Sequence, residues 1–310
     1  MATPPISTPD TGPAWIGIAW MVVTGLLFVA VTGIVRYVGS DVPAPQAAFL
    51  RYLFGIVIMA PFLWSLLRRG FTRRSFAIYS LRGITHALGV TLWFYAMARI
   101  PIAEVVAIGY TAPIYITIGA ALFLGERLAA RRMLAIAAGF LGAMIILRPG
   151  FQDISGGQIA QLISAPLFAV SYLIAKRLSR DESPTVIVGM LTIFVTIGLA
   201  PMAAAVWVTP SLSDTIWLAV VAVVATLGHM TMTKALGAAP LMVTQPVTFL
   251  QLVWATILGV ALFGEAVDGW VILGGGVIIA AVSFISYREW VLSRADPALR
   301  NTTPPAVATK

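Results

Sequence analysis

The sequence predicts an all-α integral membrane protein with ten transmembrane helices, and three observations lead to this fold class. Hydrophobic residues form 59% of the 310 residues and charged residues only 10%, whereas a soluble domain carries about 25% charged residues. The mean hydropathy is correspondingly high, at +0.94. The apolar residues fall into ten runs of roughly 20 residues, the length that an α-helix needs to cross about 30 Å of hydrocarbon.

The ten predicted spans are separated by polar breaks that are too short to form a soluble domain. The first span follows 13 residues without lysine or arginine, which is typical of a first transmembrane helix rather than a cleaved signal peptide. Later breaks contain turn and charged residues: "GSDVPAPQ" after the first span, "RRGFTRRS" after the second, "RPGFQDISGG" after the fifth and "SRDESP" after the sixth. The predicted spans are 14–38, 46–67, 76–98, 101–123, 129–148, 157–179, 185–208, 214–236, 240–263 and 269–289.

The positions of the lysines and arginines predict that both termini lie in the cytoplasm. Cytoplasmic loops of membrane proteins are enriched in these residues. With a cytoplasmic N-terminus, fifteen of them fall on the inner side and three on the outer side, namely Arg36, Arg99 and Arg148. The polar segment 290–310 contains prolines and is predicted to be a disordered cytoplasmic tail.

The sequence also contains a weak internal repeat, with an offset of 139 or 140 residues. The aligned pairs include Leu88-Gly89 with Leu227-Gly228, Pro101 with Pro240, Gly125-Glu126 with Gly264-Glu265, and Leu27-Phe28 with Leu167-Phe168. Each unit, 14–148 and 157–289, holds five spans, so the second unit must cross the membrane in the opposite direction. The flanking charges agree, because the first Gly-Glu pair is followed by arginines (127, 131 and 132) and the second by Asp268. Two inverted five-helix repeats are typical of secondary transporters.

Four segments carry a resemblance to a known family. They are "FLRYLFGIVIMAPF" (49–62), "MARIPIAEVVAIGYTAPIYITIGAALFLGERL" (97–128), "GFLGAMIILRPG" (139–150) and the degenerate second copy "KALGAAPLMVTQPVTFLQLVWATILGVALFGE" (234–265). They resemble the EamA-type members of the drug/metabolite transporter superfamily. The resemblance implies a pseudo-symmetric ten-helix carrier with a central cavity formed mainly by spans 1, 3, 4, 6, 8 and 9, and alternating access without ATP. Members mostly move amino acids, other small metabolites, nucleotide-like cofactors or drugs, often outward.

These observations predict a secondary transporter, most simply an exporter of a small organic metabolite, an amino-acid-like solute or a drug across a bacterial-type inner membrane. The alternative is an importer of a cofactor-like molecule such as a flavin or a nucleoside derivative. A membrane-embedded enzyme is a third hypothesis, but it would need catalytic carboxylates or histidines gathered at one membrane face. Glu126 and Glu265 fall on opposite faces, which argues against an enzyme.

The composition also argues against several partners and cofactors. The chain has no cysteine and only two histidines, so we expect no metal site and no bound cofactor. The net charge of +8 is spread over short clusters between apolar runs rather than gathered in one patch, which argues against nucleic acid. The expected partners are a small-molecule substrate, the lipid bilayer and, as a hypothesis, protons as a coupling ion. The oligomeric state is left open.

Ionisable residues inside the spans are candidates for gating or coupling, because burying a charge in lipid costs about 2.5–3.5 kcal/mol on insertion scales. Arg51 and Glu104 lie at matching depths in the outer third of spans 2 and 4, so an ion pair between them is one interpretation. Three roles stay open for them: a purely structural pair or snorkelling of Arg51 to the headgroups, gating, and contact with a charged substrate. His229 in span 8 is a further coupling candidate.

Several residues are predicted to bind substrate. His86 lies close to the midplane of span 3 and either lines the cavity or is a satisfied buried histidine. Lys234 could receive a carboxylate or phosphate from inside, or simply follow the positive-inside rule. Trp93, Tyr110 and Tyr115 are the preferred aromatic residues, because the family's cavity uses spans 3 and 4.

Polar and proline residues in the spans add further candidates. Thr248 and Gln251 lie on a polar stripe of span 9, which either binds substrate or joins neighbouring helices. Pro113 and Pro246 interrupt spans 4 and 9, and each removes a backbone hydrogen bond and permits a kink. Both prolines are candidates for gating; packing, for which proline is also common in transmembrane helices, is the alternative.

Overall fold

The structure is a computed structural model of the chain, and it describes residues 14–67, 72–124, 130–148, 150, 153–178, 182, 184–238, 244 and 247–295. The regular elements of this part are α-helices. They are α1 (Ala14–Val38), α2 (Ala44–Leu67), α3 (Arg73–Met97), α4 (Ile102–Gly109), α5 (Ala112–Leu124), α6 (Ala130–Leu147), α7 (Gly156–Leu178), α8 (Pro184–Ala205), α9 (Leu212–Ala238), α11 (Leu250–Phe263) and α12 (Gly269–Ala295).

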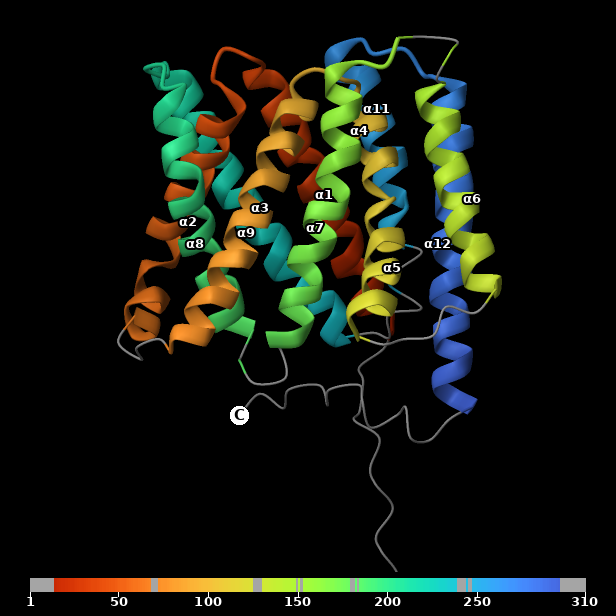
Figure 1. Cartoon of the computed structure of the whole chain (residues 1–310). Helices are drawn as coiled ribbons and strands as arrows, with labels where there is room; N and C mark the ends of the chain where they lie inside the picture. Colours follow the sequence, from red (N-terminus) through yellow and green to blue (C-terminus); the bar gives the residue numbers. More distant parts are fainter. Residues whose placement is uncertain are drawn as a thin grey trace, which may run out of the picture.

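The helices run up and down along one common direction and form a single bundle (Figure 1). We call the end at which α1 finishes and α2 begins the upper end; it lies at the top of Figure 1. By length and composition, five described helices could cross a membrane: α1, α2, α7, α8 and α9. Shorter apolar stretches lie in α4–α5, α6, α11 and α12. Large apolar side chains face outward, with Leu122, Leu134 and Val57 each about two-thirds exposed or more, as expected of a surface in contact with lipid.

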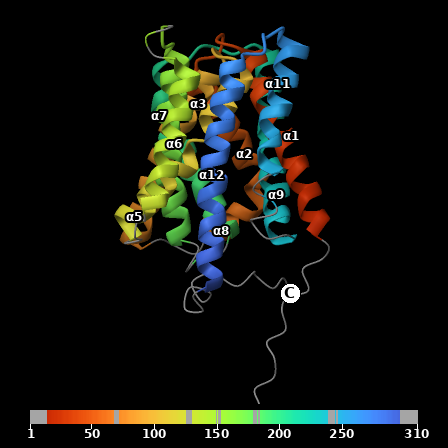
Figure 2. The same ribbon diagram turned by 90° about the vertical axis from the view of Figure 1, so that its right-hand side faces the viewer.

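The helices pack in matching combinations. Helix α1 packs along α9 and α11, while α7 packs along α3 and α5. Helix α2 packs against α8, and α6 against α12. In each case a helix from the N-terminal part of the chain lies beside one from the C-terminal part, and Figure 2 shows α6 and α12 side by side.

Two glycines allow the close approach of α6 and α12. A Cβ atom at Gly142 would lie 2.7 Å from the carbonyl oxygen of Gly274, and a Cβ at Gly274 would lie 2.5 Å from the carbonyl oxygen of Gly142. Only residues without a side chain let two helix backbones approach so closely. Ile146 and Ile278, both buried, pack beside this contact.

The predicted fourth span, 101–123, is divided into two helices. Helix α4 ends at Gly109 and α5 begins at Ala112. Pro113 has no N–H with which to continue the hydrogen-bond pattern of α4. The Thr111 amide and hydroxyl both bond to the carbonyl of Ile108, at 3.0 and 2.7 Å, which closes the turn between the two helices. The expected interruption near Pro113 is therefore present, as a break.

The predicted disordered tail begins too early in the sequence. Helix α12 continues to Ala295, so residues 290–295, which we had assigned to a disordered tail, are helical. The apolar stretch ends near 284, but the residues that follow are compatible with a helix and no proline occurs until Pro297. A proline disfavours helical backbone in the residue before it, which gives the later end point a physical reason. The segment 296–310 lies outside the described residues.

Candidate functional site

The polar side chains inside the bundle centre on His86 of α3. Its Nε2 lies 2.9 Å from the hydroxyl of Tyr52 on α2, and its Nδ1 lies 3.1 Å from Oγ of Ser171 on α7. A neutral imidazole has one N–H donor and one acceptor nitrogen, and a hydroxyl can fill either role. Both ring nitrogens are therefore satisfied, and the ring is held between helices from both parts of the chain.

Aromatic and cationic side chains surround this histidine. The ring of Phe168 on α7 lies with its centroid 5.0 Å from that of His86 and 6.2 Å from that of Trp93, edge-on in both cases. The guanidinium carbon of Arg51 lies 4.1 Å from the centroid of the Tyr52 ring, a cation–π distance. We call this set the histidine cluster: Arg51, Tyr52, His86, Trp93, Phe168 and Ser171.

The second histidine of the chain makes a corresponding contact. The rings of His229 on α9 and Phe28 on α1 lie 5.2 Å apart, edge-on. Phe28 and Phe168 are paired by the 140-residue offset of the sequence. A Cβ at Gly89 would lie 3.2 Å from the Phe168 ring, and a Cβ at Gly228 would lie 3.3 Å from the Phe28 ring. The same phenylalanine-on-glycine packing therefore occurs twice, each time with a histidine beside it.

A separate set of contacts closes the upper end around Glu265. Its Oε2 accepts a hydrogen bond of 2.9 Å from the N–H of Ile102, the first residue of α4. Nη2 of Arg36, in the last turn of α1, lies 3.4 Å from Oε1 in an ion pair. Gly264 ends α11 in the left-handed conformation, with φ 61°, a backbone conformation that glycine adopts most readily. That turn brings Glu265 back onto α4, where its negative charge also suits the helix N-terminus.

Further polar contacts join the two parts of the chain at the same end. Glu104 of α4 accepts a hydrogen bond from the Nε2 amide of Gln158 on α7, and both side chains are buried. The side chain of Gln46 on α2 bonds twice to the backbone of Val208, at 2.6 and 2.9 Å. Nη2 of Arg148, after α6, lies 2.5 Å from the carboxylate of Asp268, before α12. These bonds hold the upper ends of the helices together.

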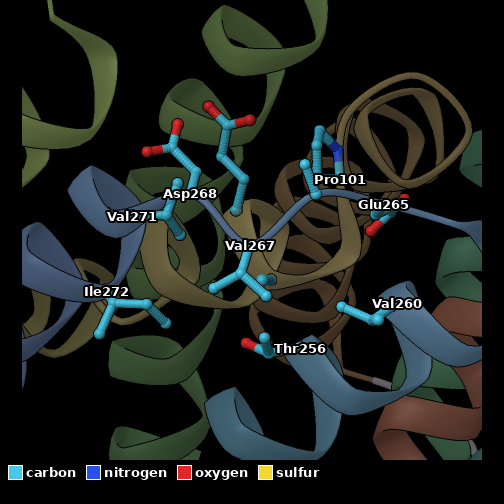
Figure 3. Close-up of a pocket in the computed structure, with 11 residues that line it drawn as sticks. Pro101, Thr256, Val260, Glu265, Val267, Asp268, Val271 and Ile272 are labelled. Carbon is cyan, nitrogen blue, oxygen red and sulfur yellow. The ribbon is translucent and has the colours of Figure 1, made fainter.

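A pocket lies between α4, α11 and α12 at this end (Figure 3), with a volume of about 400 Å³ that includes space open to solvent. Glu265 and Pro101 lie on one side of it in Figure 3 and Asp268 on another. Glu104, Thr256, Ile272, three valines and two alanines complete the lining. Because Glu104, Glu265 and Asp268 form the contacts that close this end, we assign the pocket to the closure.

Some predicted substrate residues lie away from the histidine cluster. The hydroxyl of Tyr110 donates to the backbone oxygen of Thr248 at 2.9 Å, and its ring lies edge-on to Phe249. The ring of Tyr115 lies 5.5 Å from that of Phe140 on α6. These contacts join α4 to the segment before α11 and α5 to α6.

The remaining candidates have varied surroundings. Gln251 is half-buried on α11 beside Gly25 of α1. The ammonium group of Lys234 is exposed and lies 4.7 Å from the centroid of the Trp20 ring. Pro113 lies in the first turn of α5. Pro246 lies outside the described residues.

The ion pair between Arg51 and Glu104, which their matching depths allowed, is absent. Glu104 bonds to Gln158, whereas Arg51 lies over Tyr52, and no salt bridge joins Arg51 to a carboxylate among the described residues. Equal depth places two side chains on one level of the membrane, but it does not determine which way each helix faces. The sequence expectation is corrected on this point.

Sequence reasoning did not single out Tyr52, Gln158 or Gln46, and it read Glu265 only as a marker of the repeat. Gln46 and Gln158 are buried amides near the starts of α2 and α7, and a buried amide must find partners. That rule was a usable signal for both. For Tyr52, the only signal was its position next to Arg51.

Long apolar helices, an outward-facing apolar surface and a polar cluster inside the bundle define a multi-pass membrane protein. The chain belongs to the EamA-like transporter family, whose family model matches residues 15–148 and 155–287. It thus contains the family's domain twice, and its resemblance to drug/metabolite transporters is confirmed.

Relatives of this chain carry transporter names. The riboflavin transporters of Vibrio cholerae serotype O1 and Rhizobium johnstonii are 30% and 32% identical, over 90% and 89% of this chain and 96% and 92% of their own length. An S-adenosylmethionine uptake transporter of Rickettsia bellii is 27% identical over 88% of this chain and 94% of its own. A solved crystal structure that is 21% identical shares the fold, with a TM-score of 0.55 over 90% of this chain and 98% of the other. The family and the three named relatives are transporters of small molecules.

Proposed function

We propose that the protein is a secondary transporter of a bacterial-type inner membrane, built from two inverted five-helix halves, 14–148 and 157–289. Both termini would lie on the cytoplasmic side of this membrane. The double family match and the paired packing of α1 with α9 and of α7 with α3 support the repeat. The arginine and lysine distribution supports the orientation. The upper end is then the outer end.

The proposed mechanism is alternating access by movement of one half against the other. Its structural support is that the closing contacts of the upper end all cross between the halves: Glu265 with Arg36 and Ile102, Glu104 with Gln158, and Arg148 with Asp268. Such bonds can break together when the halves separate. The histidine cluster, which also draws on both halves, lies below them.

The proposed substrate is a flat heteroaromatic metabolite of the flavin or nucleoside type, taken up from outside. The observation that carries this proposal is the histidine cluster, which combines edge-on aromatic rings with hydroxyl and imidazole groups. Aromatic rings suit a flat ring system, and a few polar groups fix its orientation. The names of the two most similar relatives reported above agree with a flavin.

Purified protein in liposomes tests this proposal. Riboflavin, nucleosides, S-adenosylmethionine and amino acids are offered outside, and uptake is measured with and without a pH gradient. We expect saturable uptake of riboflavin that Trp93→Ala abolishes, and a dependence on the pH gradient would indicate proton coupling. Saturable transport of amino acids alone would reject the proposed substrate class, and net outward movement against a gradient would favour the export first expected from the family.

A further inference from the structure

Arg51 is a cation inside α2 that no described anion neutralises. It lies seven residues after Ala44, the first residue of the helix, and no carboxylate pairs with it among the described residues. Its Nε atom is buried and has no hydrogen-bond partner there. Such a group inside a membrane protein is a functional candidate, because a buried donor without an acceptor is unfavourable.

We propose that Arg51 binds the transported substrate directly, by donating hydrogen bonds to adjacent acceptors on the edge of its ring system. This inference rests on the proposed function and names the group that recognises the substrate. The sequence left a structural role, gating and contact with a charged substrate open for Arg51; the proposal selects substrate contact and extends it to an uncharged ring edge.

Among the described residues, no acceptor takes the hydrogen bond that the Arg51 Nε–H can donate. The Tyr52 ring, 4.1 Å from the guanidinium carbon, covers the group by a cation–π contact that consumes none of its N–H groups. Tyr52 is itself fixed, because its hydroxyl bonds to His86 at 2.9 Å. The guanidinium is therefore positioned before substrate arrives, which reduces the entropy lost on binding.

Arg51 also lies where a substrate would touch both halves. It stacks on Tyr52, whose hydroxyl bonds to His86 on α3. Helix α2 packs against α3, α8 and α9, so it borders helices of both halves. A ligand held by Arg51 can therefore respond to movement of one half against the other.

The chemistry of a flavin ring fits this donor. The edge formed by the carbonyl oxygen O4 and the ring nitrogen N5 carries two neighbouring acceptors, whereas the sugar-alcohol chain on N10 crowds the N1–O2 edge. The Nε–H and one Nη–H of arginine point in parallel and match two adjacent acceptors. Lysine has a compact ammonium group and cannot reproduce that pair of bonds.

The test is a binding measurement on the full-length protein in lipid nanodiscs, with riboflavin and 5-deazariboflavin as probes, read by quenching of flavin fluorescence. The second probe carries a C–H in place of N5 and so lacks one acceptor. Wild type is compared with Arg51→Gln, Arg51→Lys and the control Arg99→Gln. Arg99 also lies over a tyrosine, at 3.8 Å from the Tyr95 ring, but at the exposed end of α3.

We expect Arg51→Gln to raise the Kd for riboflavin about tenfold to a hundredfold, the range for a hydrogen bond to a charged group. We also expect the preference of wild type for riboflavin over 5-deazariboflavin to disappear in this variant, to shrink in Arg51→Lys and to persist in Arg99→Gln. If Arg51→Gln does not fold, Arg51→Lys alone tests the proposal, through the ratio of its Kd for 5-deazariboflavin to its Kd for riboflavin.

An equal loss of affinity for both probes would indicate a structural role and overturn the proposal, as would unchanged binding in both Arg51 variants. If wild type bound neither probe, the proposed flavin substrate would fail and this inference with it. If wild type bound riboflavin and both Arg51 variants bound it equally well, only the role of Arg51 would be rejected, and the proposed substrate would stand.

Discussion

Replacing Glu265 by alanine is expected to open the upper end of the bundle. The substitution removes the acceptor of the Ile102 N–H bond and the partner of Arg36. A hydrogen bond to a charged group contributes about 1.5–3 kcal/mol. The Arg36 pair, at 3.4 Å and with the arginine 23% exposed, adds at most about 1 kcal/mol after screening by solvent.

The free energy of opening the upper end should therefore fall by about 2–3 kcal/mol. This corresponds to at least a tenfold rise in the ratio of molecules with an open upper end to molecules with a closed one. Since the chain has no cysteine, a single Ala107→Cys substitution provides a clean reporter. Ala107 is fully buried on α4 in the closed arrangement. Labelling by a membrane-impermeant maleimide then reports the open fraction.

We expect the labelling rate of Ala107→Cys to rise about tenfold or more when Glu265→Ala is added. Glu265→Gln should give a smaller rise, because its amide oxygen can still accept from Ile102. Asp214→Asn is the control, since the bonds of Asp214 within the described part of the chain are all to Ser211, in its own turn at the same end. Equal labelling rates in Glu265→Ala and the control would refute the reasoning.

Three further predictions follow from the described contacts. Tyr52→Phe removes one hydrogen bond to His86, so it should lower the free energy of unfolding by about 1 kcal/mol, measured by thermal unfolding in detergent. A double-mutant cycle of Arg148→Ala and Asp268→Ala should give a coupling energy under about 1 kcal/mol, because both side chains are partly exposed, at 27% and 33%; a larger value would contradict this. Gly142→Ala should destabilise the protein by about 1–3 kcal/mol, since its Cβ would lie 2.7 Å from a backbone oxygen of α12 that cannot move aside easily; an unchanged unfolding midpoint would show that the two helices can separate without loss.

The bundle was largely predictable from the sequence, for a physical reason. In lipid every backbone group must be bonded within its own segment, so each crossing appears as a long apolar run. Beyond the lipid this constraint no longer applies, and there the predicted start of the disordered tail, at residue 290, was wrong. Helix α12 continues to Ala295 beyond its apolar stretch, because helix propensity and the position of the next proline decide its end.

The site was predictable only in part. His86 was found because an ionisable group in an apolar span is costly and therefore conspicuous. Tyr52 and Ser171, which hold it, are ordinary residues in such spans and gave no comparable signal. The interpretation of Arg51 and Glu104 as a pair does not hold, because depth is encoded by position along a span, whereas the facing direction depends on how the helices pack.

The most direct test of the central claim is trans-stimulation of riboflavin uptake in proteoliposomes. A carrier that works by alternating access opens its binding site to one side of the membrane at a time. Reorientation of this site is faster with substrate bound than without it, or occurs only with substrate bound, so substrate on the far side speeds uptake. We predict that vesicles loaded with unlabelled riboflavin take up labelled riboflavin faster than empty vesicles, with saturation. Uptake that is unsaturable and indifferent to internal riboflavin would contradict alternating access by this protein.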